Sequence, residues 1–270
     1  MHESALSGSL DSARIYDLGH DLEADTPVSA SHPPFRMGLV RRHGDLVRED
    51  GSTAANELLT LSGHTGTHID ALCHMAHGGR LHGGADALAA SQGGRFTVHG
   101  VETIKPIVCR GVLVDVPAAD GRGELDAGEP ITAQDMARTC DAQRVSVRAG
   151  DAVLVRTGWP VHHFQPPERM LGVATGVPGP DASAARWLAE RGVRVTGSDT
   201  IAYEHLAPGM GHTQLPVHVI LLVESGIHII EVLDLEELAR DGVHEFWFVA
   251  APLKIVGATG SPLRPLAIVP

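Results

Sequence analysis

The amino-acid sequence predicts an α/β protein folded as a single domain. Short runs of β-branched residues, bounded by turn residues, alternate with segments that have the apolar spacing of amphipathic helices. A chain of 270 residues is long enough to enclose one sizeable core. Strands and helices mix without a strict strand–helix–strand rhythm, and no Gly-x-Gly-x-x-Gly motif lies between a strand and a helix. These observations favour a mixed α/β fold over a dinucleotide-binding fold.

Three strands are expected in the middle of the chain, at residues 111–116, 151–156 and 193–197. Each is short and rich in valine, as buried strands are. Two late strands are expected at 246–249 and 253–256. The apolar runs 218–223 and 227–232 are each compatible with a strand or a helix, because short apolar runs do not distinguish the two.

Helices are expected at residues 131–140 and 181–191. In the first, Thr132 precedes Asp135 by three residues, which is the spacing of an N-terminal capping pair. The second has its apolar residues on one face and ends at Gly192, a residue type that commonly terminates helices. A further short helix is expected to begin at 235–238, whereas 25–36 is expected to be irregular.

The composition argues against several classes of protein. The formal net charge of −12 argues against a nucleic-acid surface, which is normally basic. Three cysteines without a Cys-x-x-Cys pair do not suggest a disulfide framework. No apolar run approaches the roughly 18 residues of a membrane helix, and the polar segment 1–14 does not resemble a secretion signal. We therefore expect a cytoplasmic protein with a flexible N-terminal segment at 1–14.

The densest group of metal-ligand side chains is His64, His68, Asp70 and His74, within eleven consecutive residues. Imidazole and carboxylate are the donors that suit Zn²⁺ or Mn²⁺. On a regular helix Asp70 and His74 would rotate away from the other two, and on a straight strand His64 and His68 would lie about 13 Å apart. The chain is therefore expected to curl, with Gly66 supplying the conformational freedom.

Other interpretations of the cluster involve no metal. The histidines could be solvent-exposed loop residues, or one could be a core histidine paired with Asp70. His218, beside an apolar run, is by itself equally compatible with core packing. Glu231 lies in the apolar run Ile229–Val232, so its carboxylate needs a partner, either a metal or an arginine.

The segment His-Thr-Gly-Thr-His-Ile-Asp-Ala-Leu-Cys-His at 64–74 resembles the HxGTHxDxPxH signature of the cyclase-like metal hydrolases. That family includes bacterial kynurenine formamidases and isatin hydrolase. Further segments that agree with it are 110–115, 150–158, 197–199, 218–231 and 251–262. The resemblance therefore extends from about residue 15 to about residue 268. It implies the swivelling β/β/α architecture and a homodimer or homotetramer.

The resemblance also implies roles for individual residues. His64, His68 and Asp70 would bind one metal ion, and Asp70 would bridge to a second ion held by His218 and Glu231. His74 would act as the general acid/base beside the metal, because a histidine of ordinary pKa transfers protons at neutral pH. Leu72 stands where the family motif has proline, so the motif does not identify the substrate.

The resulting hypothesis is a hydrolase that uses one or two Zn²⁺ or Mn²⁺ ions to cleave C–N bonds other than peptide bonds. The substrate would be a small amide, a cyclic isatin-like amide or an aryl formamide. Alternatives are a lactone or ester hydrolase of the same family and a non-catalytic metal-binding protein. Phe35 and Trp159 are candidates for an apolar substrate-binding wall. The roles of five further residues stay open: His77, His82, His212, Asp199 and Glu204.

Overall fold

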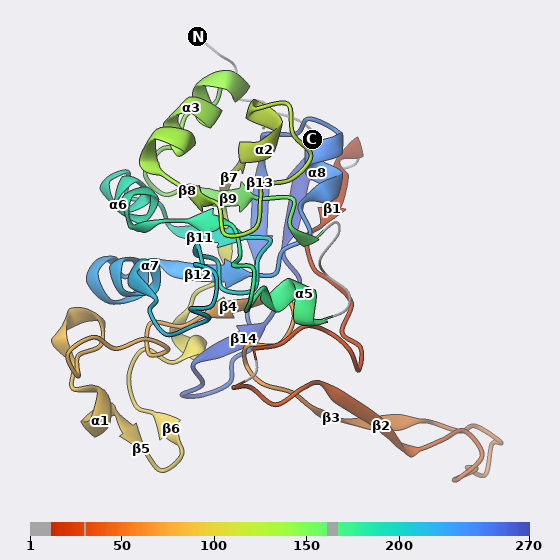
Figure 1. Ribbon diagram of the computed structural model, residues 1–270. Coiled ribbons are helices and arrows are strands. Elements are labelled where there is room, and N and C mark those ends of the chain that lie inside the picture. Colours follow the sequence, from red (N-terminus) through yellow and green to blue (C-terminus); the bar gives the residue numbers. More distant parts are fainter. Residues whose placement is uncertain (1–11, 30, 161–166) are drawn as a thin grey trace.

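The computed structural model describes residues 12–29, 31–160 and 167–270, and its centre is a nine-stranded sheet (Figure 1). The strands follow the order β1-β15-β13-β7-β9-β11-β12-β4-β14 across the sheet. Their bounds, in that order, are Arg14–Asp17, Leu266–Val269, Glu245–Ala250, Ile107–Asp115, Ala152–Arg156, Val195–Ser198, His228–Glu231, His68–Asp70 and Gly260–Pro262. The α/β class expected from the sequence is therefore confirmed.

The four central strands β7, β9, β11 and β12 run parallel, and the strands on either side of them are antiparallel to their neighbours. Within β7, Val112 and Val114 face one hydrophobic cluster and Leu113 faces the other. Both faces of the sheet centre are therefore covered. This explains why the sequences of its strands are continuous apolar runs and do not alternate between apolar and polar residues.

Helices α3 (Ala133–Gln143) and α6 (Ala182–Glu190) pack into the cluster on one face of the sheet. The predicted capping pair is present, because the side chains of Thr132 and Asp135 each accept a hydrogen bond from the other's backbone N–H. Other helical segments are α1 (Ala87–Ala90), α2 (Val116–Ala119), α5 (Pro167–Leu171), α7 (Pro216–His218) and α8 (Glu236–Arg240), with the 3₁₀ turns η2 (His82–Gly84) and η3 (Val101–Thr103).

Among the described residues, three two-stranded ribbons lie outside the main sheet: β2 with β3, β5 with β6, and β8 with β10. Their bounds are Arg36–Arg41, Asn56–Thr60, Ser91–Gln92, Arg95–Phe96, Pro130–Ile131 and Gly179–Pro180. The β2–β3 hairpin projects away from the rest of the molecule (Figure 1). The sequence did not predict it.

Several local expectations change with the structure. Residues 253–256 form no strand, and the apolar side chains in this segment are exposed. The ambiguous run 218–223 is helical, because α7 continues into the π-helix η4 (Val219–Ser225). Residues 1–11 of the predicted N-terminal segment lie outside the described residues, and β1 begins at Arg14. No helix among the described residues is long and apolar enough to span a membrane.

Candidate metal centre

The histidine motif begins in a turn and ends in a strand. Gly66 has a φ angle of +59°, so the chain curls where the sequence predicted. The backbone N–H of Ser62 donates to Thr65 Oγ1 at 3.0 Å, which closes the turn. We expected the whole motif to lie outside regular helix and strand. This expectation is wrong for its second half, because His68–Asp70 form strand β4. His68 and Asp70 are two residues apart on that strand and therefore share one face.

Strand pairing brings Glu231 to the motif. Glu231, the last residue of β12, lies directly opposite His68 of β4 in the antiparallel register. Asp70 lies opposite Gly260 of β14 on the other side. A Cβ atom at residue 260 would come within 2.7 Å of the His64 ring, so glycine leaves room for that imidazole.

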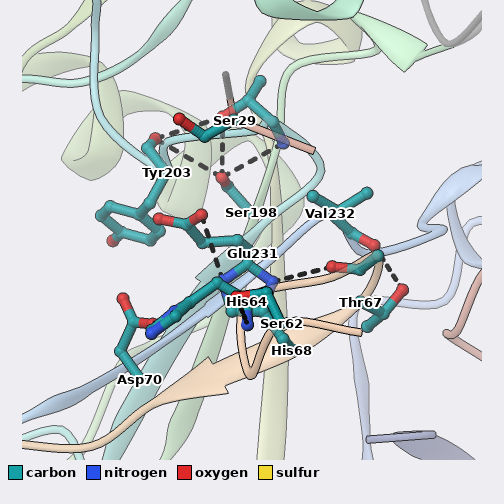
Figure 2. A network of polar contacts seen from close by, with 12 residues as sticks. Ser29, Ser62, His64, Thr67, His68, Asp70, Ser198, Tyr203, Glu231 and Val232 are labelled. Carbon is teal, nitrogen blue, oxygen red and sulfur yellow. Dashed lines mark hydrogen bonds and ion pairs between the residues drawn. The ribbon is translucent and has the colours of Figure 1, made fainter. Parts of the chain in front are cut away.

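Three histidine side chains converge on Asp70 and Glu231 (Figure 2 shows Asp70 and Glu231 with His64 and His68). Nδ1 of His64 lies 2.8 Å from Oδ1 of Asp70. Nε2 of His68 lies 3.6 Å from Asp70 and 3.5 Å from Glu231. Nε2 of His218 lies 3.6 Å from Asp70 and 3.2 Å from Glu231. The five residues predicted as metal ligands therefore form one buried cluster.

Each of the three histidines in this cluster has its second ring nitrogen next to a polar partner. His64 Nε2 lies 2.9 Å from the Thr259 hydroxyl, and His68 Nδ1 lies 2.8 Å from the carbonyl oxygen of Gly66. His218 Nδ1 lies 2.6 Å from Oε1 of Glu204. Such partners fix the ring orientation and tautomer of metal-ligating histidines.

The oxygens of Asp70 show that the cluster fits a cation. Both are buried, yet neither accepts a hydrogen bond within the described residues. Nδ1 of His64 lies 2.8 Å from Oδ1 of Asp70, but the two atoms do not have the geometry of a hydrogen bond. Both are atoms that can bind a metal ion. A buried carboxylate without hydrogen bonds is costly unless a cation compensates it. Two groups of mutually close donor atoms share Asp70: His64 with His74, and His68 with Glu231.

His74 lies at the edge of the cluster and differs from the other histidines. Its ring stands 4.1 Å from the ring of His64 and 6.2 Å from that of His218, centroid to centroid. Within the described residues its ring nitrogens have no hydrogen-bond partner. Burial lowers the pKa of His74 to about 3, although Asp70 opposes this shift, so its ring is neutral at neutral pH.

Burial and mutual contacts also shift the pKa values of the cluster residues. Burial raises the pKa of Glu231 to about 7. Burial opposes the charge on His218, but the hydrogen bonds to Glu204 and Glu231 outweigh it and raise the His218 pKa to about 10. Burial lowers the pKa of His68 to about 4. Without a metal the cluster therefore retains protons that a cation would displace.

A cavity of about 190 Å³ opens onto the cluster. Its lining comprises Ser29, Ser31, His32, His64, His68, His74, Met75, Ile201, Ala202, His212, Leu215, His218 and Glu231. Neither predicted wall residue lines it. Phe35 is buried elsewhere, and Trp159 packs behind the wall, in the cluster that contains Ile201 and Ala202. The apolar wall consists of aliphatic residues, which the sequence did not single out.

The residues whose roles the sequence left open occupy different places. His212 lines the cavity, and its Nδ1 lies 3.3 Å from the Ser29 hydroxyl. His82 lies 2.9 Å from the Val223 carbonyl oxygen, outside the cavity, and His77 is on an exposed turn. Asp199 accepts hydrogen bonds from Thr157 and Gly158, which fixes the loop after β9. Glu204 and Thr259 orient two histidines of the cluster, and no sequence pattern indicated this.

Comparison with known proteins covers nearly the whole chain. The sequence model of the Cyclase family, described as "Putative cyclase", matches residues 16–205. The chain is 27% identical over 270 residues to isatin hydrolase of Roseibium aggregatum, covering 98% of this chain and 94% of that protein. It is 27% identical over 248 residues to kynurenine formamidase of Geobacillus thermodenitrificans, covering 92% and 94%. The crystal structure of a novel cyclase matches with a TM-score of 0.84 and 29% identity, covering 95% and 88%.

Proposed function

The chain belongs to the cyclase family, as its histidine motif predicted, and on that premise we propose that it is a metal-dependent hydrolase of small amides. The observation that carries this proposal is the buried Asp70 carboxylate, which lacks hydrogen bonds and is surrounded by imidazole nitrogens. The similarity to isatin hydrolase and to kynurenine formamidase supports hydrolysis of a C–N bond.

His64, His68 and Asp70 would hold one Zn²⁺ or Mn²⁺ ion, and Asp70 would share a second ion with His218 and Glu231. The fixed second nitrogens of His64, His68 and His218 support a ligand role for each of them. When bound, the metal would lower the pKa of water and polarise the substrate carbonyl.

His74 would transfer the protons of the reaction. Its ring lines the cavity and has no hydrogen-bond partner within the described residues. Its pKa of about 3 in the metal-free protein differs from the ordinary histidine pKa on which the sequence expectation was based, so the neutral ring is free to accept a proton but holds it weakly. A neutral imidazole can accept a proton from the attacking water and donate it to the leaving nitrogen. The nearness of His74 to His64 and Asp70 makes a ligand role its alternative, and the experiment below separates the two roles.

The cavity favours a neutral substrate. Met75, Ile201, Ala202 and Leu215 provide apolar contacts, and no Lys or Arg of the described residues lines it. Apart from the bound metal, the described residues offer no Lys or Arg at the cavity to compensate a substrate carboxylate facing Glu231, which costs binding energy. A neutral cyclic amide of the isatin type therefore fits the cavity better than an aryl formamide carrying a free carboxylate.

The test is a substrate panel with the metal-reconstituted protein and the variant His74→Ala. We expect hydrolysis of isatin-like amides and a loss of turnover of at least about 100-fold in the variant, with bound metal unchanged. The exposed His77 supplies the control variant His77→Ala, which should retain activity.

Three outcomes would contradict the proposal. If His74→Ala loses its metal while activity per bound metal is unchanged, His74 is a ligand and not the acid/base. Metal binding without turnover of any amide or formamide would indicate a binding protein. Turnover of lactones alone would replace the amide assignment.

A further inference from the structure

A smaller cavity, of about 150 Å³, lies at the edge of the sheet where the parallel strands begin. Lys105 precedes β7 by two residues, Arg194 directly precedes β11, and His228 is the first residue of β12. Parallel strands begin at the same edge of a sheet, so three segments that are distant in the sequence meet at this amino-edge cavity. Its lining comprises Thr103, Ile104, Lys105, Ile107, Arg194 and His228.

The amino-edge cavity is separate from the metal centre. It shares no lining residue with the cavity that opens onto the centre. His228 is the first residue of β12 and Glu231 is the last, and three steps of about 3.3 Å place them roughly 10 Å apart. A small ligand in the amino-edge cavity would therefore not bind to the metal.

The charge of this lining is opposite to that of the chain. Lys105 and Arg194 are positively charged at neutral pH, and no carboxylate lines the cavity. The chain as a whole has a net charge of −12 and contains only two lysines, Lys105 and Lys254. Two cations at one cavity therefore form a local positive site on an acidic protein, and such a site attracts small anions.

Neither cation is neutralised within the described residues. Lys105 makes no hydrogen bond or ion pair there, and Arg194 donates a single side-chain hydrogen bond, from Nη2 to the Pro106 carbonyl oxygen at 3.2 Å. Asp151, which directly precedes β9 between β7 and β11, lies 2.7 Å from Arg110 and is paired with it. The remaining N–H groups of Lys105 and Arg194 are therefore available to a ligand.

The floor of the cavity is fixed. Ile104 and Ile107 are buried, and Nδ1 of His228 lies 2.9 Å from the carbonyl oxygen of Asp70. A preformed floor reduces the ordering that a ligand must impose when it binds. The volume is below the roughly 300–1,000 Å³ of sites that enclose drug-sized ligands, so the cavity suits a small ion or one end of a larger molecule.

We propose that the amino-edge cavity binds a small oxyanion with two negative charges, a phosphate group, between Lys105 and Arg194. Two guanidinium N–H groups can pair in parallel with two phosphate oxygens, and an ammonium group binds another oxygen as a point charge. Two positive charges match a dianion better than a monocarboxylate, which would leave one of the cations without a counter-charge.

The test is calorimetric titration of the full chain with inorganic phosphate at about pH 8 and constant ionic strength. We expect one saturable site with a Kd of about 1 mM or tighter. Lys105→Gln and Arg194→Gln should each weaken binding at least about 10-fold, because each removes a charge-assisted hydrogen bond. Lys254→Gln, at the exposed lysine outside the cavity, is the matched control and should bind phosphate as the wild type does.

Two further probes define the ligand. Methyl phosphate keeps the two negative charges and adds an ester group. Tighter binding of methyl phosphate than of inorganic phosphate assigns the cavity to a phosphate monoester, and weaker binding assigns it to free phosphate. Either result supports recognition of a phosphate group. Acetate should bind at least about 10-fold more weakly than inorganic phosphate, and equally tight binding of acetate would overturn the assignment to a dianion.

The variants should fold as the wild type does, because Lys105, Arg194 and Lys254 are exposed, and circular dichroism checks this. Three results would overturn the proposal. The first is the absence of saturable phosphate binding in the wild-type chain. The second is unchanged binding in both Lys105→Gln and Arg194→Gln. The third is loss of phosphate binding when a chelator removes metal, because the phosphate would then be bound to the metal.

Discussion

The carboxylate of Glu204 makes three polar contacts with Val217 and His218. It accepts hydrogen bonds from the backbone N–H groups of Val217 at 3.1 Å and His218 at 3.0 Å, and Oε1 lies 2.6 Å from Nδ1 of His218. Nε2 of the same ring is then left to face Asp70 and Glu231. A residue fourteen positions earlier in the chain therefore orients one side of the candidate metal centre.

Glu204→Gln should weaken metal binding. The amide removes the negative charge that favours a proton on Nδ1 and can place an N–H opposite that nitrogen. Loss of such a partner typically lowers metal affinity about 10- to 100-fold. Competition with a chromogenic chelator measures the change. Glu224→Gln, at an exposed glutamate that pairs with Arg186, serves as the control and should bind as the wild type does. Equal affinity in both variants would show that Glu204 has no orienting role.

Metal binding should release about one proton or more per protein at pH 7. With its pKa raised to about 10, His218 is protonated in the metal-free protein, whereas a ligating imidazole is neutral. Metal affinity should therefore rise with pH. In the metal-free protein the raised pKa of His218 stabilises the fold below about pH 6.5, and this stabilisation is lost as the pH rises through about 10.

Calorimetric titration in two buffers of different ionisation enthalpy counts the released protons. Glu204→Gln should release fewer, because the carboxylate that raises the pKa of His218 is absent. The absence of any buffer dependence in the wild-type protein would contradict protonation of His218.

Asp70→Asn should abolish stabilisation by metal. A ligand that binds only the folded state stabilises it by about 2.7 kcal/mol at a concentration one hundred times its dissociation constant. The wild-type melting temperature should therefore rise with Zn²⁺ or Mn²⁺ and return to the metal-free value with a chelator. Asp70→Asn should show no rise, whereas Asp126→Asn, at a carboxylate 93% exposed, should match the wild type. A full rise in Asp70→Asn would remove Asp70 from the ligand set.

The first half of the candidate centre could be predicted because its donors lie within eleven residues. His218 and Glu231 were assigned only through the family resemblance, since strand pairing and not sequence distance brings Glu231 opposite His68. Glu204 and Thr259 were not assigned, because a carboxylate or hydroxyl that orients a distant ring leaves no pattern in one sequence. Contacts between distant segments are the part that local spacing cannot predict.

The fold, like the site, was predicted only in part. Strands β7, β9 and β11 were predicted because burial on both faces requires continuous apolar runs. The run 253–256 was predicted as a strand for the same reason, but its apolar side chains are exposed. The β2–β3 hairpin was missed because neither of its faces is buried within the chain, so it lacks the alternation of a half-buried strand.

Comparing Gly66→Ala with Gly78→Ala should distinguish an effect on the unfolding free energy from an effect on the geometry of the metal centre. The φ angle of +59° costs an alanine about 1–2 kcal/mol, and a new Cβ would meet the flexible end of Leu22 at 2.5 Å. Gly78 has a similar φ of +55° with nothing within 4 Å, so Gly78→Ala carries the backbone cost alone. Chemical denaturation should therefore show comparable losses of unfolding free energy in the two variants.

Metal affinity should fall in only one of these two variants. The Gly66 carbonyl oxygen accepts a hydrogen bond from Nδ1 of His68, and the turn it closes places His64 against Asp70. A shift of that turn moves two donors, whereas Gly78 lies on an exposed turn outside the cluster. Chelator competition on both variants makes the comparison. If Gly66→Ala and Gly78→Ala bind metal equally well, the left-handed turn at residue 66 does not position the ligands.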